Sequence, residues 1–200
     1  SPQPLKQAPR LFGVGVKLEG SSISLLPAQS NLAQAVSEYY SVNRAFLEKF
    51  EPKRSEEFFT LRFQESQLVE EEQLRSEKRG YRFYLVENAE PQKVIGTISL
   101  SSVVWKAFCS CFMGYGLDAE HGGRGYMTEA VSLVTKHAFE ELGLHRIEAN
   151  VMPRNKASLR VLEKNGYENE GMSRKYLNIN GVWEDHIHMV ALNEKGQTNV

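Results

Sequence analysis

The sequence predicts a mixed α/β domain built on one sheet. Short β-favouring runs alternate with helical stretches along the chain, and no repeat or linker divides it in two. A glycine-rich turn joins the strand-like run 112–117 to a helix whose apolar residues recur with the 3.6-residue period of one buried face. Near the end, Asn180-Gly181 separates two strand-like segments, 167–179 and 182–192, which is typical of a hairpin.

Composition and charge exclude several classes of protein. The 200 residues are 41% hydrophobic and 24% charged with a net charge of −1, so no overall field recruits nucleic acid or an anionic membrane. No apolar run approaches the roughly 18–20 residues of a membrane span, and there is no direct nucleic-acid motif. The only cysteines, Cys109 and Cys111, predict reduced thiols in a cytoplasmic protein. We expect 1–10 to be a flexible tail and 11–200 a single domain.

The first part of the chain predicts one strand, closed by a proline, and three helices. Asn31 can cap the first helix, and the second stops shortly before a proline, because the residue before proline disfavours helical dihedrals. The third helix is rich in charge, and we expect Glu70-Glu71-Glu72 on its solvated face rather than at a metal. The expected ranges are 22–26 for the strand and 43–50 and about 55–78 for the second and third helices.

Four further strands and two helices precede the hairpin. Residues 94–101 alternate between apolar and polar, as in a half-buried strand, and 108–117 is its natural antiparallel partner. The helix after the glycine turn ends at Gly143, and the next helix ends at Gly166. The expected ranges are 81–87, 94–101, 108–117 and 146–152 for the strands and 127–142 and 155–165 for the helices.

Three glycines in four positions, Gly122, Gly123 and Gly125, form the turn before the longer helix. Such a turn lets the backbone approach a ligand closely, and the N–H groups at the helix N-terminus then face an anion. A tight turn that needs glycine only for its dihedrals explains the same residues equally well. The two common phosphate motifs, Gly-x-x-x-x-Gly-Lys-[Ser/Thr] and Gly-x-Gly-x-x-Gly, are absent here. The loop alone therefore leaves both interpretations open.

Polar side chains mark the strand 146–152. Glu148 and Asn150 share one of its faces, whereas a central strand in such a sheet is apolar on both. The pair suggests a lined cavity, although an edge strand would show the same pattern. Directly afterwards, Asn155 is a good helix N-cap, and Ser158 lies about one turn into the same helix.

Together these motifs resemble the GNAT superfamily of acetyl-CoA-dependent N-acetyltransferases, and more narrowly its RimJ/RimL branch, the ribosomal-protein N-terminal acetyltransferases. The first resemblance rests on Gly123-Arg124-Gly125 before a helix, then a strand, then Asn155-x-x-Ser158-x-x-x-Leu162-Glu-Lys-Asn-Gly166-Tyr167. The narrower one, closest to RimJ, spans roughly residues 20–192 and rests on Tyr39-Tyr40, Asn43-Arg44-x-Phe46-Leu47, Phe50-Glu51-Pro52, Ile95-Gly96, Gly114-Tyr115, His145-Arg146-Ile147, Ala149-Asn150, Met152-Pro153 and Asn180-Gly181-x-Trp183-x-Asp185-His186.

The resemblance implies a mostly antiparallel sheet of six to seven strands, splayed at the acetyl-CoA site, with helices on both faces. Acetyl-CoA would enter the splay as co-substrate, with its pyrophosphate on backbone N–H groups and its pantetheine arm beside the strand that ends near Leu117. No metal is implied. The residues implied in cofactor binding are Leu117, Asp118, Ala119, Gly122, Gly123, Arg124, Gly125, Tyr126, Met127, Asn155 and Ser158.

The chain departs from the family pattern in two places. In the phosphate loop, Glu120 stands where Gln or Arg is frequent, and Gly122 where many relatives carry a larger residue; backbone N–H groups do most of the work there, so we expect binding to be kept. In the following helix, Leu162 occupies the place of the tyrosine that protonates the leaving thiolate in many GNAT enzymes. In RimL-like enzymes that role has been attributed to a serine that matches Ser158, which is therefore the expected proton donor.

The remaining catalytic and acceptor residues have alternatives. Glu148 or Asn150 is the expected polar end of a water relay that removes the amine's proton, and a structural hydrogen bond within the sheet is the alternative for Glu148. Tyr115, Asp185 and His186 are the expected acceptor-binding residues, and hairpin scaffolding explains the last two about as well.

The resemblance implies transfer of an acetyl group to the N-terminal α-amine of a protein, in the RimJ case the N-terminal alanine of a small-subunit ribosomal protein. Ribosome association and a homodimer are compatible with this function. Two alternatives stay open: acetylation of a small amine such as an antibiotic, a polyamine or an amino acid, and a non-catalytic ribosome-assembly factor on the same fold. An acid-lined, shallow groove would favour a peptide acceptor, and a closed pocket would favour a small molecule.

Overall fold

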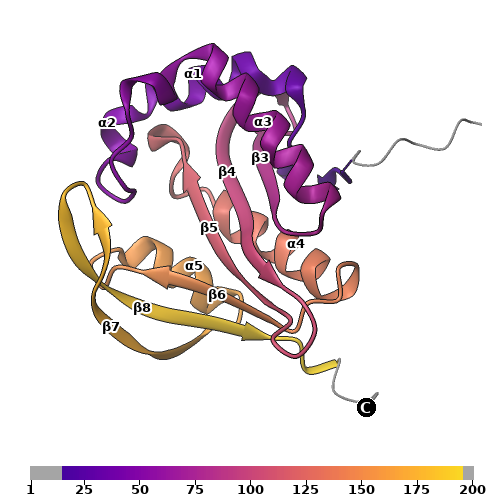
Figure 1. Ribbon diagram of the computed structural model, residues 1–200, viewed down its shortest axis with the longest axis vertical. Coiled ribbons are helices and arrows are strands. Elements are labelled where there is room, and N and C mark those ends of the chain that lie inside the picture. Colours follow the sequence, from indigo (N-terminus) through magenta and orange to yellow (C-terminus); the bar gives the residue numbers. More distant parts are fainter. Residues whose placement is uncertain (1–14, 196–200) are drawn as a thin grey trace, which may run out of the picture.

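The structure is a computed structural model that describes residues 15–195; the expected tail, 1–10, lies outside the described residues. One mixed sheet has the strand order β1-β2-β3-β4-β5-β6-β8-β7 (Figure 1). The predicted mostly antiparallel mixed sheet is confirmed, and over the described residues it has eight strands rather than six to seven because a two-residue strand joins one edge. The strands are β1 (Leu18–Glu19), β2 (Ile23–Pro27), β3 (Tyr81–Glu87), β4 (Glu90–Val104), β5 (Ser110–Leu117), β6 (Arg146–Val151), β7 (Glu168–Ile179) and β8 (Val182–Leu192).

The sheet splays open between β5 and β6, which run parallel to each other. The two strands pair from Ser110 with Arg146 to Met113 with Ala149, and β5 then continues to Leu117 without a strand partner on that side among residues 15–195. In Figure 1, β6, β8 and β7 turn away from β3, β4 and β5. The backbone groups on the free side of β5 are therefore open to an extended ligand, as the resemblance implied.

Helices cover both faces of the sheet, as predicted. Successive side chains of β3 point to opposite faces of the sheet, and apolar side chains are buried on both faces. Phe83 packs in one core cluster with Val134 of α4, whereas Tyr84 packs in a second cluster with Leu68 of α3 and Val36 of α1. The helices are α1 (Ala33–Val42), α2 (Arg44–Leu47), α3 (Leu61–Ser76), α4 (Tyr126–Glu140) and α5 (Lys156–Lys164), with short 3-10 turns η1 (Ser30–Leu32), η2 (Glu56–Phe59) and η3 (Ala119–His121).

Two predicted helix boundaries are wrong. Asn31 does not cap a helix but lies inside η1, and Leu32 precedes α1 without a side-chain cap. The expected helix 55–78 is divided into η2 and α3 at Thr60, whose backbone is extended (φ −86°, ψ 150°). Its hydroxyl accepts the N–H of Phe63 at 3.2 Å, which caps α3 and compensates for the break.

The prediction that the acidic run of α3 is wholly solvated is also wrong. Glu71 is 4% exposed, and its carboxylate lies 3.0 Å from Nε of Arg82 and accepts a hydrogen bond from the Tyr84 hydroxyl. The partners come from β3, so the sequence of α3 alone carries no sign of them. A buried charge of this kind persists only when it is paired and hydrogen-bonded.

Both cysteines are free thiols, with Cys111 in the core of the sheet and Cys109 just before β5. Burial raises the pKa of the Cys111 thiol to about 12, so it stays protonated at neutral pH. Within residues 15–195, no helix has the length and apolar character that crossing a bilayer requires.

Candidate functional site

The glycine loop turns the chain from β5 into α4. Gly123 and Gly125 both have φ +77°, a left-handed conformation that other residues adopt only with strain, and Gly125 is the N-cap of α4. Gly122 has φ −68°, and a Cβ there would meet no atom within 4 Å. The backbone therefore requires glycine at positions 123 and 125 but not at 122, which explains how relatives can carry a larger residue at that place.

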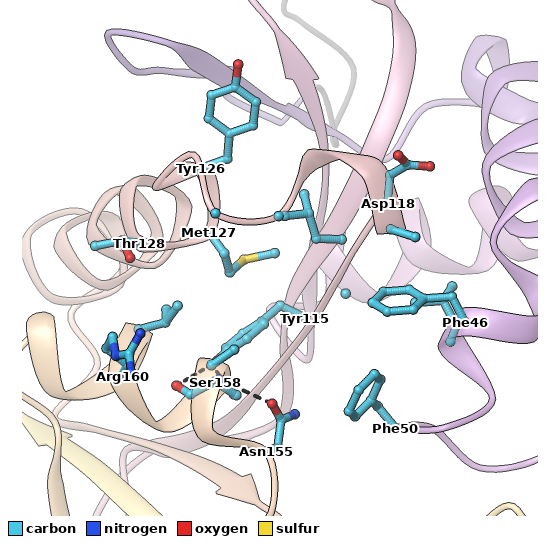
Figure 2. Close-up of a pocket in the computed structure, with 18 of the residues that line it drawn as sticks. Phe46, Phe50, Tyr115, Asp118, Tyr126, Met127, Thr128, Asn155, Ser158 and Arg160 are labelled. Carbon is cyan, nitrogen blue, oxygen red and sulfur yellow. Dashed lines mark hydrogen bonds between the residues drawn. The ribbon is translucent and has the colours of Figure 1, made fainter.

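A cavity of about 420 Å³ lies between this loop, the end of β5, α5 and the segment around α2 (Figure 2). All the residues predicted to hold the cofactor line it, except Arg124. The Arg124 side chain is about half exposed and lies near Glu87, 3.8 Å away, on the outside of the loop. The cavity thus brings together two segments, 117–127 and 155–158, that the sequence motifs had marked separately.

The walls of this cavity fit the parts of acetyl-CoA. The backbone at the start of α4 offers N–H groups to a pyrophosphate, and the free side of β5 offers a strand partner to the pantetheine arm. Phe46 and Phe50 add apolar surface opposite α5 (Figure 2). Arg160 and Lys164, one turn apart on α5, also line the cavity and could pair with phosphate groups. None of these four residues was predicted as part of the site. For Arg160 and Lys164, their spacing on the helix that follows Asn155 was the available signal.

Asn43 fixes the point at which β5 ends. Its amide donates to the Asp118 carboxylate at 2.7 Å, and its carbonyl oxygen accepts the N–H of Ala119 at 3.0 Å. Burial raises the pKa of Asp118, but hydrogen bonds from His121 and Asn43 outweigh it and hold the pKa below its usual value. The Asp118 backbone is engaged as well, since its N–H donates to the carbonyl oxygen of Ile95 at 2.7 Å and its carbonyl oxygen accepts the N–H of His121 at 3.1 Å. Asp118 therefore helps to shape this wall of the cavity.

Two hydroxyl groups meet between β5 and α5. The Oδ1 atom of Asn155 accepts the N–H of Ser158 at 3.2 Å, so the predicted N-cap of α5 is confirmed. The Ser158 hydroxyl lies 2.6 Å from the Tyr115 hydroxyl, at the inner end of the cavity (Figure 2). Burial raises the pKa of Tyr115 to about 12, although the hydrogen bond with Ser158 opposes this shift. Both hydroxyls therefore carry protons at neutral pH and can donate them.

A second cavity, of about 260 Å³, lies against the first. The two share five lining residues: Phe50, Glu51, Tyr115, Asn155 and Ser158. The rest of the second cavity is more polar and draws polar side chains from the segment before η2 and from distant strands of the sheet: Arg54, Arg82, Thr97, Ser99, Asn150 and His186. A ligand in the first cavity and a ligand in the second can therefore meet beside the Tyr115–Ser158 pair.

Of the two predicted relay residues, Asn150 and Glu148, only one lies at the second cavity. Asn150 lines the second cavity, but Glu148 does not; it pairs with Arg146 at 3.0 Å. His188 links Asn150 to Glu148, because its Nδ1 lies 2.5 Å from Oδ1 of Asn150 and 3.4 Å from the Glu148 carboxylate. The other ring nitrogen, Nε2, lies 2.7 Å from the Ser173 hydroxyl. Glu148 can therefore act on the cavity only through His188 and Asn150.

The two acceptor-binding candidates of the hairpin, Asp185 and His186, also lie in different surroundings. His186 is 3% exposed and lines the second cavity, so it remains a candidate for acceptor binding. Asp185 lines neither cavity; its carboxylate accepts the N–H of Lys175 at 2.8 Å, across the hairpin. The scaffolding alternative therefore accounts for Asp185. Among the described residues, no group of three His, Cys, Asp or Glu side chains could hold a metal ion.

Comparison with known proteins identifies the fold and the chemistry. Residues 24–168 match the family described as "Acetyltransferase (GNAT) domain". The chain is 43% identical over 176 residues to the probable N-acetyltransferase YjcK of Bacillus subtilis, covering 88% of this chain and 97% of that protein. It is 33% identical over 155 residues to the Escherichia coli [ribosomal protein uS5]-alanine N-acetyltransferase, covering 78% of this chain and 79% of that one.

A solved structure agrees with these relatives. The ribosomal-protein-S5-alanine acetyltransferase of Vibrio fischeri superimposes with a TM-score of 0.88 at 36% identity, over 92% of this chain and all of that chain. The family match covers well over half of the chain, and the glycine loop, the splay and the Asn155–Ser158 turn lie within it. The chain therefore belongs to the GNAT family and is an acetyl-CoA-dependent N-acetyltransferase.

Proposed function

We propose that the acceptor of the acetyl group is the N-terminal α-amine of a protein, and that this protein is a small-subunit ribosomal protein with an N-terminal alanine. The observation that carries the proposal is a path for an extended chain. A third cavity, of about 520 Å³, shares Arg82 and Ser99 with the second and runs along β4 toward α3. A small amine needs only the second cavity, whereas a peptide whose first residue sits there needs such an exit.

The proposed alanine at the first position of the acceptor rests on the relatives. The names of the E. coli and V. fischeri relatives specify an alanine acceptor, and their similarity supports the same acceptor here. This function would place the protein in the cytoplasm, in contact with ribosomal protein before or during assembly of the ribosome.

The proposed mechanism is direct transfer between the two cavities. Acetyl-CoA supplies the thioester whose carbonyl carbon the amine attacks. The backbone at the glycine loop and at the end of β5 holds the cofactor, and Asn155 orients the first turn of α5. Ser158 donates a proton to the departing sulfur, and the Tyr115 hydroxyl behind it stabilises the Ser158 oxygen while the proton moves.

A small amine that also carries an acid group is the second candidate. Arg54 and Arg82 line the second cavity beside Glu51, so its wall is not predominantly acidic. This charge arrangement would accept an amino acid as well as the start of a peptide. Because the chain is an enzyme of the family, the non-catalytic alternative is no longer needed to explain the fold.

Mass spectrometry of acceptor mixtures tests the proposal. The purified protein is incubated with acetyl-CoA and three acceptors: a peptide that begins with alanine, the same peptide with a blocked N-terminus, and free alanine. We expect the first peptide to gain one acetyl group and the other two to stay unchanged. Acetylation of free alanine but not of the peptide would contradict the proposed acceptor and leave the small-amine candidate.

A further inference from the structure

Glu51 stands at the joint between the two cavities and has no role in the sequence motifs of the cofactor site. It follows α2, where its N–H donates to the carbonyl of Leu47 at 3.1 Å. Its side chain is 23% exposed and lines the first and the second cavity. A carboxylate in this place would border the thioester of a bound acetyl-CoA on one side and a bound acceptor on the other.

The backbone of β5 makes room for this carboxylate. A Cβ at Gly116 would lie 3.1 Å from Oε1 of Glu51 and 3.3 Å from the hydroxyl oxygen of Tyr39. The glycine thus lets both polar groups approach the strand that would hold the cofactor. The Tyr39 hydroxyl is buried and has no hydrogen-bond partner among the described residues, so a donor beside the carboxylate is left unused.

The nearby cations leave the Glu51 carboxylate only weakly paired. Arg54, which follows it in the chain, reaches it at 3.5 Å, with its guanidinium 4.2 Å from the centre of the Phe58 ring. Arg82 of β3 faces the same cavity but is held by Glu71 at 3.0 Å and by the Tyr40 hydroxyl at 2.6 Å. Room for a further positive charge therefore remains at Glu51.

The other titratable groups around Glu51 are phenols, an imidazole and one further carboxylate, Asp118, which His121 and Asn43 already hold. From α1, Tyr39 and Tyr40 are phenols; from β5 and β8, Tyr115 and His186 line the same cavity; Asp118 lies at the end of β5. Burial raises the pKa of Glu51, although Arg54 and Arg82 oppose the shift. A carboxylate with a raised pKa is better suited to take a proton from an ammonium group than a solvated one.

We propose that Glu51 binds the acceptor's ammonium group and takes its proton, so that the neutral amine can attack the thioester. The inference rests on the proposed function only in that an amine occupies the second cavity; it does not require that this amine belong to a protein. Glu51 is then a catalytic residue on the segment after α2, separate from the Asn150–His188–Glu148 chain on the far side of the cavity.

The proton balance is complete. The ammonium nitrogen gives one proton to the Glu51 carboxylate, its lone pair forms the bond to the carbonyl carbon, and the bond between carbon and sulfur breaks. The nitrogen loses a second proton as the amide forms, which balances the proton that the sulfur receives through Ser158. Glu51 returns its proton to solvent through the open side of the cavity, so one proton is released per acetyl group transferred.

The variants Glu51→Gln and Glu51→Asp test the proposal, with Glu57→Gln as the matched control, since Glu57 is an exposed glutamate of η2 that lines neither cavity. Acceptor turnover is measured across pH with acetyl-CoA in excess. We expect Glu51→Gln to lower kcat/KM about 100-fold near neutral pH, as for loss of a general base, with Glu51→Asp in between. Calorimetric titration with acetyl-CoA and thermal unfolding should be unchanged, which shows that the variants are folded.

The pH dependence separates a base from a structural group. An α-amine titrates near pH 8, so the deficit of Glu51→Gln should be largest at about pH 6.5 and should narrow toward about pH 9, where the acceptor is already neutral. A deficit of constant size across this range, or a loss of less than about threefold, would overturn the proposal. So would a wild-type protein that acetylates no amine. If only free alanine is acetylated, the peptide proposal fails, and the same comparison on alanine decides the role of Glu51.

Discussion

The two adjoining cavities are built in different ways. The cofactor cavity takes about half of its lining residues from one continuous stretch, 115–128, and offers backbone groups at a left-handed glycine turn. The second cavity combines short pieces of elements far apart in the sequence and takes its polar side chains from several of them, among them Arg82 of β3, Asn150 of β6 and His186 of β8. A backbone site tolerates many side chains, as at Glu120 and Gly122, whereas a side-chain site changes its specificity with each substitution. A substitution in the second cavity can therefore change the acceptor while the cofactor site is kept.

The largest effect is expected where the two cavities meet. Ser158→Ala removes the hydroxyl that faces the departing sulfur but keeps the Asn155 cap, which uses the backbone of residue 158. We expect kcat to fall by about 10²-fold or more, the contribution of a general acid, with acetyl-CoA affinity nearly unchanged. Stopped-flow or steady-state turnover with a saturating acceptor measures this. A variant with full activity would assign the proton donor to Tyr115 or to water instead.

The next effect concerns the cofactor cavity alone. Gly125→Ala places a side chain at φ +77°, which costs about 1–2 kcal/mol, whereas Gly122→Ala is unstrained and meets open space. We expect the first variant to bind acetyl-CoA about tenfold more weakly and the second to bind it normally. Calorimetric titration compares them. Equal affinity in both would mean that the left-handed turn does not shape the phosphate site.

A third variant tests the acceptor path alone. Ser99→Phe puts a ring at the passage between the second and third cavities, and Ser99 lies outside the wall of the cofactor cavity. We expect KM for the peptide to rise about tenfold from the blocked space, with the affinity for acetyl-CoA unchanged. Initial rates at varied peptide concentration supply the value. An unchanged KM would show that the peptide leaves the second cavity by another route.

The smallest effect concerns the support of the glycine loop. Glu129, one turn into α4, accepts hydrogen bonds from the backbone N–H groups of Ser21, Ser22 and Ile23. Burial raises its pKa, but these bonds and one from the Ser21 hydroxyl outweigh burial and lower it. In this solvent-exposed setting, we expect Glu129→Gln to cost about 1 kcal/mol of the free energy of unfolding.

The pH dependence of that cost has a definite sign. Because the folded pKa of Glu129 is lowered, its contribution is fully present above the unfolded value of about 4.3 and is lost as pH falls through the folded pKa. Urea unfolding of the wild-type protein and the variant should therefore give curves that are separated at about pH 7 and converge below about pH 4. A separation that persists at low pH would mean that the Glu129→Gln variant is destabilised by a change of shape rather than of charge.

Features fixed by short-range chemistry were predictable from the sequence. The cap at Asn155, the hairpin at Asn180-Gly181 and the glycine turn depend on dihedrals and hydrogen bonds within a few residues, and the structure bears them out. The break at Thr60 between η2 and α3 was not predicted, because residues on both sides of it favour helix. The aromatic residues of η2 pack into the core there and interrupt the helix.

Features that depend on the tertiary fold were not predictable. Glu71 looks like one of three exposed glutamates until β3 brings Arg82 and Tyr84 to it. Glu51 was part of a recognised block but had no chemical partner in the sequence, and only the splay between β5 and β6 places it at a cavity junction. The cofactor site could therefore be largely foreseen, whereas the acceptor site required the structure.

The division into a cofactor cavity and an acceptor cavity can be tested with a crystal structure of a bisubstrate analogue, in which CoA is joined through an acetyl link to the N-terminus of an alanine-first peptide. We expect CoA to fill the cavity at the glycine loop, the link to pass between Glu51 and the Tyr115–Ser158 pair, and the peptide to run past Ser99. A peptide that leaves over α5, or over the outer side of the β7–β8 hairpin, would contradict the division into a cofactor cavity and an acceptor cavity.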